Sequence, residues 1–279
     1  MATQVQPKDK TVMANGLKLH YLDWGSEALP PMVLLHGLRG HAHSWDDVSA
    51  AFCSTHHVLA LDQRGRGDSD PAPGGDYSTQ AFVDDLAAFV EVLGLPPFTL
   101  VGHSMGGRNS MAFTARYLEQ VTKLIIVDIG PSIEPRGADR IRQEIQAVPE
   151  AFDTFEDAVA YMSKQNRYAS DDVLRRRLRY ATTTLPDGKV GWRYDRAIRE
   201  QSRNGTGAPA VDLWPALPKI TCPTLIVRGS DTDLLSPEVA QQMLDTLPNA
   251  QLAEVPRAAH MVFEDNPEGF IKAMQQYLQ

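Results

Sequence analysis

A serine set between glycines is the feature of this sequence that points most directly to chemistry. Residues 102–106 read Gly-His-Ser-Met-Gly, a G-x-S-x-G sequence with Ser104 at its centre. An apolar run at 97–101 precedes it and a helical pattern at 108–118 follows it. This order of strand, serine and helix is typical of a nucleophile elbow, a strained turn that exposes the serine hydroxyl at the edge of a sheet. We therefore predict that Ser104 is a nucleophile.

A serine nucleophile needs a base that takes its hydroxyl proton. His260 lies in a loop at 256–264, between the last predicted strand and the final helix. In elbow-type folds the chain order is serine, acid, histidine, and His260 is the only histidine after His103. The sequence therefore predicts that His260 is the base.

The acid that orients this base has three candidates. Asp231 and Asp233 follow the predicted strand at 225–228, and Asp128 follows the predicted strand at 124–127. Parallel strands end at one edge of a sheet, so all three carboxylates could reach His260. Only one is expected to be buried against the imidazole, whereas the others would cap helices or orient loops.

Two backbone N–H groups are expected to form an oxyanion hole. Met105 follows the nucleophile and would supply the first, and Leu38, in the loop at 36–40, would supply the second. Gly37 gives this loop the freedom to turn the amide inward. His36 is expected to be a structural hydrogen-bonding residue behind the loop.

The elements that must hold these residues alternate along the chain. Short apolar runs at 32–35, 57–61, 98–101, 123–127, 224–227 and 251–255 predict strands that are covered on both faces. Helical patterns lie between them, most clearly at 78–94, and Asn15-Gly16 predicts a hairpin within 11–24. We therefore expect an α/β fold with a mostly parallel, doubly wound sheet.

One region interrupts this alternation. No convincing strand is predicted between residues 131 and 215, where segments at 137–148, 154–164 and 171–181 have helical patterns. We interpret 131–215 as a helical cap, or lid, on a core formed by 1–130 and 216–279. The alternative is that these helices pack on a face of the sheet.

Composition narrows the possible partners. The net charge of −8 argues against nucleic acid, and no apolar run approaches the ~20 residues that span a bilayer. The N-terminal residues have no apolar signal region, so we expect a cytoplasmic protein. Cys53 and Cys222 are expected to be free thiols, and the sequence shows no metal-ligand set and implies no cofactor. We expect a small-molecule substrate and a monomer or homodimer.

Taken in order, five motifs resemble the α/β-hydrolase superfamily: His36-Gly37, the segment 62–69, the serine elbow, the segment 128–131 and His260. The resemblance implies an α/β-hydrolase fold with a helical lid insertion. A serine in the elbow resembles the esterase, lipase and C–C-bond hydrolase branches, because haloalkane dehalogenases and most epoxide hydrolases have aspartate there. Asp62 and Arg64 lie in a motif that is generally structural in this family.

A narrower resemblance bears on the acid. Residues 106–110 together with 128–131 are similar to strings in (acetamidomethylene)succinate hydrolase-type enzymes and in small carboxylesterases. In some of these the acid follows the sixth strand, which corresponds to Asp128. Because this chain also carries Asp231 and Asp233, we place Asp233 slightly ahead and keep Asp128 as its competitor.

The leading interpretation is a cofactor-free serine hydrolase that cleaves small carboxylic esters through an acyl-enzyme on Ser104. Arg39, Arg108, Trp45 and Met261 are the candidate substrate-binding residues, and arginines of the lid could bind a substrate carboxylate if they are not simply solvated. The alternatives are amide or C–C bond hydrolysis of a carboxylate-bearing substrate, perhydrolase or acyltransferase activity, and a non-catalytic ligand receptor.

Overall fold

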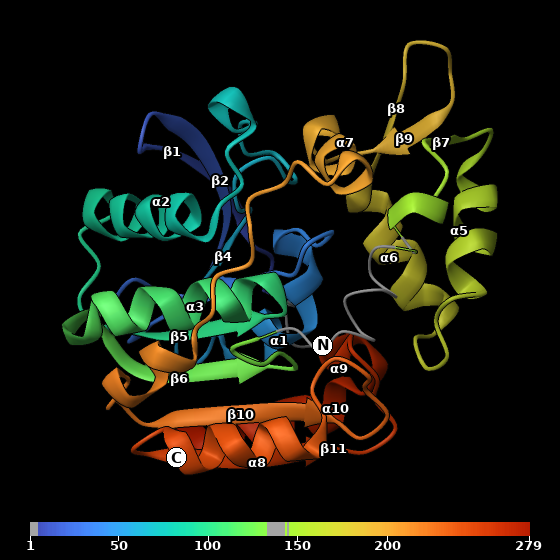
Figure 1. The fold of residues 1–279 in the computed structure, drawn as a ribbon. Helices are drawn as coiled ribbons and strands as arrows, with labels where there is room; N and C mark the ends of the chain where they lie inside the picture. The colour runs from blue at the N-terminus through green and yellow to red at the C-terminus, as the bar shows by residue number, and fades with distance from the viewer. Residues whose placement is uncertain (1–4, 133–142, 144) are drawn as a thin grey trace.

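The computed structural model describes residues 5–132, 143 and 145–279. Its centre is an eight-stranded sheet with the order β1-β2-β4-β3-β5-β6-β10-β11 (Figure 1). The strands are β1 (Lys8–Ala14), β2 (Leu17–Trp24), β3 (Pro31–Leu35), β4 (His57–Leu61), β5 (Phe98–His103), β6 (Val121–Val127), β10 (Thr224–Gly229) and β11 (Ala250–Val255). From β4 to β11 all neighbours pair in parallel, whereas β1 and β2 are antiparallel. The predicted mostly parallel sheet is confirmed.

The N-terminal hairpin forms at the predicted turn. Asn15 and Gly16 have φ values of 49° and 75°, which is the left-handed pair that a tight type I′ turn requires. This turn fixes the register, in which Ala14 pairs with Leu17 and Lys8 with Asp23.

Helices cover both faces of the sheet and create two separate cores. The helices are α1 (Asp46–Phe52), α2 (Thr79–Val92), α3 (Met105–Arg116), α8 (Pro237–Thr246), α9 (Val262–Asp265) and α10 (Pro267–Leu278), with 3-10 turns η1 (Ala42–Trp45), η2 (Pro73–Gly75), η3 (Leu118–Gln120) and η4 (Trp214–Lys219). Side chains of α2, α3 and α8 pack on one face, and those of α1, α9 and α10 pack on the other. Burial on both faces explains the unbroken apolar runs of β3, β4 and β5.

The chain between β6 and β10 leaves the sheet and folds as a separate layer, which we call the insertion (Figure 1). Its elements are α5 (Phe155–Ser163), α6 (Asp171–Ala181), α7 (Arg196–Asn204), β7 (Ala151–Phe152), β8 (Thr182–Thr184) and β9 (Val190–Trp192). A small core of its own includes Phe152, Met162 and Leu178. Two predicted helices form as expected, with Thr154 and Ser170 as N-caps, and most of the predicted helix at 137–148 lies outside the described residues.

The expectation that the insertion contains no strand is wrong. The strands β7, β9 and β8 form an antiparallel three-stranded sheet in that order. Each strand has only two or three residues, so none is long enough to produce an alternating pattern in the sequence.

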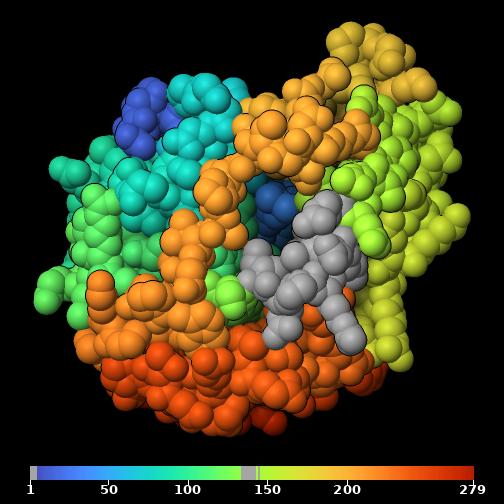
Figure 2. Space-filling model, viewed as in Figure 1, coloured from blue at the N-terminus to red at the C-terminus, as the bar shows by residue number. Residues whose placement is uncertain are grey.

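The insertion lies over the edge of the sheet where the parallel strands end. Figure 2 shows the molecule hollowed between the insertion and the rest of the chain, with residues of the N-terminal part visible at the bottom of the hollow. In the part of the chain that the structure describes, no helix has the length and apolar character needed to cross a bilayer.

Candidate active site

Ser104 occupies a strained turn between β5 and α3. Its φ of 54° and ψ of −117° lie outside the ordinary regions for a residue with a side chain, at a cost of about 1–3 kcal/mol. A Cβ on Gly102 would lie 2.3 Å from the carbonyl oxygen of Gly106, and a Cβ on Gly106 would lie 2.3 Å from that of Leu35. Both glycines are therefore required by the close crossing, and the predicted elbow is present.

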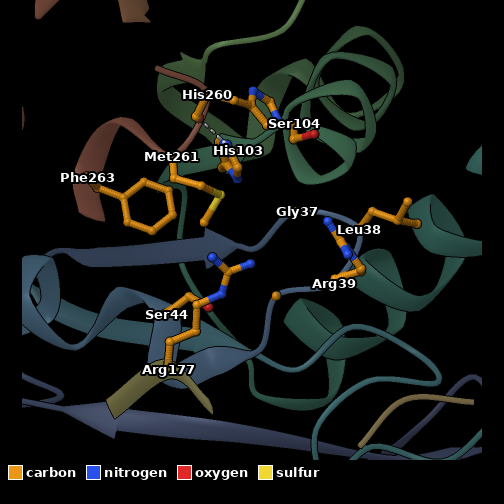
Figure 3. Close-up of a pocket in the computed structure, with 11 residues that line it drawn as sticks. Gly37, Leu38, Arg39, Ser44, His103, Ser104, Arg177, His260, Met261 and Phe263 are labelled. Atoms are coloured by element: carbon orange, nitrogen blue, oxygen red, sulfur yellow. Dashed lines mark hydrogen bonds between the residues drawn. The ribbon is translucent and has the colours of Figure 1, made fainter. Parts of the chain in front are cut away.

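The imidazole of His260 pairs with a buried carboxylate. His260 Nδ1 lies 2.9 Å from Asp128 Oδ2, and Asp128 is completely buried. The same carboxylate accepts hydrogen bonds from the Gly229 N–H at 3.0 Å and from the Thr232 hydroxyl at 2.5 Å. Burial raises the pKa of Asp128 to about 7, against the lowering effect of these two hydrogen bonds. In Figure 3 the imidazole lies beside the side chain of Ser104.

The other two candidate acids lie in solvent. Asp231 and Asp233 are both exposed, and Asp231 accepts a hydrogen bond from the Tyr168 hydroxyl of the insertion. The geometry thus pairs His260 with Asp128 and corrects the preference for Asp233. The correction has a physical reason, because the aspartate directly after β6 is enclosed by the loop after β10, whereas that loop itself faces solvent.

His103 supports the loop of His260 and was missed by sequence reasoning. Its Nε2 donates to the carbonyl oxygen of His260 at 2.8 Å, and the two rings lie 4.6 Å apart. Burial lowers the pKa of His103 far below its usual value, so the ring is neutral. Its position before the nucleophile was the available signal, but the contact with residue 260 depends on the tertiary fold.

The two expected oxyanion-hole residues lie next to Ser104. Met105 is the first residue of α3, where backbone N–H groups have no acceptor within the helix, and Leu38 lies in the loop after β3. His36 holds this loop, since its Nδ1–H donates to the Gly37 carbonyl at 2.7 Å and its Nε2 accepts from the Gln63 N–H at 3.0 Å. Burial lowers the pKa of His36 to about 4. A neutral, structural His36 is what the sequence predicts.

Asp62 and Arg64 brace the turn after β4, as the resemblance implies. Asp62 is buried and accepts hydrogen bonds from His20 Nδ1 at 2.7 Å and from the Ala42 N–H at 2.6 Å. Arg64 donates twice to Asp85, at 2.5 and 2.6 Å. His20, Asp62 and Asp68 also bring potential metal-ligand atoms within 4.8 Å of one another, but the hydrogen bond between His20 and Asp62 gives this group a bracing role.

Arg66, in the same turn, reaches the oxyanion-hole residues and was also missed. Its side chain is almost fully buried. Nε donates to the Leu38 carbonyl at 3.2 Å, and Nη2 lies 3.5 Å from Met105 Sδ. The guanidinium carbon lies 4.9 Å from the ring centre of Tyr77 and 5.3 Å from that of Phe82. No charge pattern in the sequence distinguishes Arg66 from its neighbour Arg64.

Two cavities meet at Ser104, and both are lined by Ser104 and Leu38. The histidine-side cavity, with about 560 Å³ of empty space, is also lined by Arg39, Arg177, His260, Met261 and Phe263 (Figure 3). The insertion-side cavity, with about 1100 Å³ of empty space, extends under the insertion and is also lined by Arg66, Tyr77, Phe82, Met105, Arg108 and Ile198.

The four predicted substrate-binding residues lie in different environments. Arg39 and Met261 line the histidine-side cavity. Arg108 reaches the insertion-side cavity, but its guanidinium donates to the carbonyls of Gly130 at 3.2 Å, Pro131 at 2.7 Å and Val211.

The expectation for Trp45 is wrong. Its side chain is 0% exposed and stacks on Phe263 at a centroid distance of 4.3 Å. Trp45 therefore belongs to the hydrophobic core and does not line a substrate pocket.

Comparisons with known proteins agree with this architecture. The model of the alpha/beta hydrolase family matches residues 32–273. The 2-(acetamidomethylene)succinate hydrolase of Mesorhizobium japonicum is 28% identical over 89% of this chain and 88% of the relative, and esterase YbfF of Escherichia coli is 26% identical over 89% and 92%. The crystal structure of E-2-(acetamidomethylene)succinate hydrolase has a TM-score of 0.89, at 28% identity, over 98% of this chain and 99% of that one. On the match to the family model over most of its length, this chain belongs to the alpha/beta hydrolase family.

Proposed function

We propose that this protein is a serine hydrolase that cleaves small carboxylic esters. Ser104 is the nucleophile, His260 the general base, and Asp128 the acid that orients the base. The observation that carries the proposal is the pairing of His260 with the buried carboxylate of Asp128, beside a serine held on a strained elbow. A structural histidine would need neither the strained serine nor an open cavity next to it.

The geometry supports an acyl-enzyme mechanism. His260 Nε2 takes the proton of Ser104 Oγ as this oxygen attacks the ester carbonyl, while Asp128 fixes the Nδ1–H tautomer and stabilises the imidazolium. The N–H groups of Leu38 and Met105 donate to the developing oxyanion. His260 then gives the proton to the departing alkoxide. In the second half, a water attacks the acyl-enzyme while His260 takes its proton, and His260 then returns this proton to Ser104 Oγ as the acid leaves.

The two cavities divide the substrate between them. The leaving group must receive its proton from His260, so it occupies the histidine-side cavity, which His260 lines. The acyl group then extends into the insertion-side cavity, which Met105 lines and His260 does not. This assignment makes the larger cavity the acyl site.

Hydrolysis of an amide in a carboxylate-bearing substrate is the second candidate. It is favoured by arginines that line the two cavities, Arg39 and Arg177 on one side and Arg66 on the other. The similarity to a hydrolase named for a substituted succinate points in the same direction.

The test of the main proposal uses p-nitrophenyl acetate and a fluorophosphonate probe. We expect Ser104→Ala to lose ester hydrolysis and labelling while its circular dichroism spectrum and melting temperature stay close to those of the unaltered protein. Ser54→Ala, a substitution of an exposed serine, is the matched control and should retain both. Full hydrolysis by Ser104→Ala would refute the proposal.

A further inference from the structure

We infer that Arg66 binds a carboxylate on the acyl part of the substrate, so that the preferred esters are half-esters of short dicarboxylic acids. The inference rests on the proposed function, because it assigns the insertion-side cavity to the acyl group. Arg66 would then be a specificity-determining residue.

The contacts of Arg66 leave part of its guanidinium unused. A guanidinium has five N–H groups. Arg66 places one on the Leu38 carbonyl, one on the Arg64 carbonyl at 2.9 Å and one on Met105 Sδ. Among the residues that the structure describes, two N–H groups thus have no acceptor, and a thioether is a weak one. Tyr77 and Phe82 contact the face of the guanidinium, so an anion would bind at its edge, where the remaining N–H groups lie.

The positive charge of Arg66 lacks a direct counter-charge. Across the described residues it forms no ion pair, and the nearby Asp195 already accepts hydrogen bonds from the Tyr77 hydroxyl and the Ala197 N–H. Burial lowers the pKa of Arg66 to about 10, so the side chain stays protonated at neutral pH. A buried charge without a partner is costly, and a bound anion offsets that cost.

The cavity around Arg66 is selective for negative charge. Its described lining contains Arg66 and Arg108 and no Asp or Glu, although the chain as a whole carries a net charge of −8. The guanidinium of Arg108 already donates to three backbone carbonyls of the loop after β6 and of the insertion. Of the two arginines, Arg66 is therefore the one able to form new hydrogen bonds. A carboxylate and a guanidinium match in a two-point geometry.

The position of Arg66 limits the length of the acyl chain. Its guanidinium contacts Leu38 and Met105, the same residues whose N–H groups face the reacting carbonyl in the proposed mechanism. The carboxylate must therefore lie close to the ester group, as it does in a short dicarboxylic half-ester and not in a long fatty acyl chain.

The test compares three methyl esters of similar length: monomethyl glutarate, methyl pentanoate and methyl 5-amino-5-oxopentanoate. They share one leaving group and differ only in the charge and polarity of the distal end. We expect the protein to prefer the glutarate ester in kcat/KM. Arg66→Met should reduce this preference about 10- to 100-fold, mainly through KM, with Arg66→Lys in between.

One control variant and two contrary outcomes separate carboxylate recognition from other effects. Arg116→Met removes an exposed arginine that pairs with Asp84, so it lowers the total charge equally and should keep the preference. An equal loss of kcat for all three esters in Arg66→Met would show that Arg66 only positions Leu38 and Met105, and would overturn the inference. A preference of the unaltered protein for methyl pentanoate would overturn it as well.

Binding of glutarate keeps the inference testable apart from catalysis. We expect glutarate, and not pentanoate, to raise the melting temperature of Ser104→Ala, and we expect Arg66→Met to abolish this shift. If no ester is hydrolysed but the shift depends on Arg66, the proposed esterase activity fails and the anion site stands. If glutarate does not raise the melting temperature of Ser104→Ala, the anion site is refuted even where esters are cleaved.

Discussion

The carboxylate of Asp128 and the imidazole of His260 meet at 2.9 Å, although β10 separates the strands that carry them in the sheet. Asp128 follows β6 directly, and His260 lies in the loop after β11. The end of β10 and the loop after it connect the two, because Gly229 and Thr232 donate to Asp128 and the Asp231 N–H donates to the Ala258 carbonyl in the loop of His260. The acid of the proposed mechanism is thus fixed by three neighbouring strand ends.

Asp128→Asn should reduce kcat by about four orders of magnitude, because an asparagine can hold the wrong tautomer of His260. Asp233→Asn is the matched substitution at the exposed candidate and should change kcat less than about threefold, which is the effect of an ordinary surface change. The measurement is steady-state hydrolysis of p-nitrophenyl acetate. The reverse order of the two effects would assign the acid to Asp233.

The raised pKa of Asp128 predicts a stability difference that depends on pH. At pH values between the ordinary carboxyl pKa and about 7, Asp128 loses its proton in the unfolded chain but keeps it in the folded protein. The unfolded state then binds fewer protons, so the contribution of Asp128 to the free energy of unfolding falls as pH rises through this window, by at most about 1.4 kcal/mol per pH unit. Above pH 7 the contribution is constant.

Urea unfolding at about pH 5 and about pH 8 tests this linkage. Asp128→Asn cannot titrate at this position, so its free energy of unfolding should rise relative to that of the unaltered protein as pH increases. Asp233→Asn should show no such trend relative to the unaltered protein. A constant difference between Asp128→Asn and the unaltered protein at both pH values would argue that Asp128 is ionised throughout.

His103 should affect turnover through the position of His260. In His103→Phe, the His260 carbonyl loses its donor, and we expect kcat to fall about 10- to 100-fold with little change in KM, because the base moves relative to Ser104. His103→Gln can place an amide N–H near the same point and should recover much of kcat. A larger loss of kcat in His103→Gln than in His103→Phe would show that ring packing against Phe263, and not the hydrogen bond, is what matters.

Arg108 should prove to be a stability residue. Its three carbonyl acceptors join the loop after β6 to the return segment of the insertion, and their loss in Arg108→Met should cost about 3 kcal/mol of unfolding free energy. Arg116→Met, at an exposed site, should cost less than about 0.5 kcal/mol. Chemical denaturation measures both. If Arg108→Met unfolds normally but loses the preference for acidic esters, Arg108 binds substrate directly.

Features that depend on neighbouring residues were predictable from the amino-acid sequence. The hairpin turn needs positive φ at Asn15 and Gly16, and the elbow needs small residues at Gly102 and Gly106. Both requirements are visible in a few adjacent letters. The prediction that His260 is the base followed from chain order, since no other histidine comes after Ser104.

Which polar side chains are enclosed depends on the three-dimensional fold. Asp128 and Asp233 both follow buried strands, so their local patterns are alike, and their burial differs because only Asp128 is covered by a neighbouring loop. For the same reason, only the fold shows that Trp45 belongs to the hydrophobic core and that Arg66 lines a cavity. Each depends on contacts with distant residues, and such contacts leave no periodic trace in the sequence.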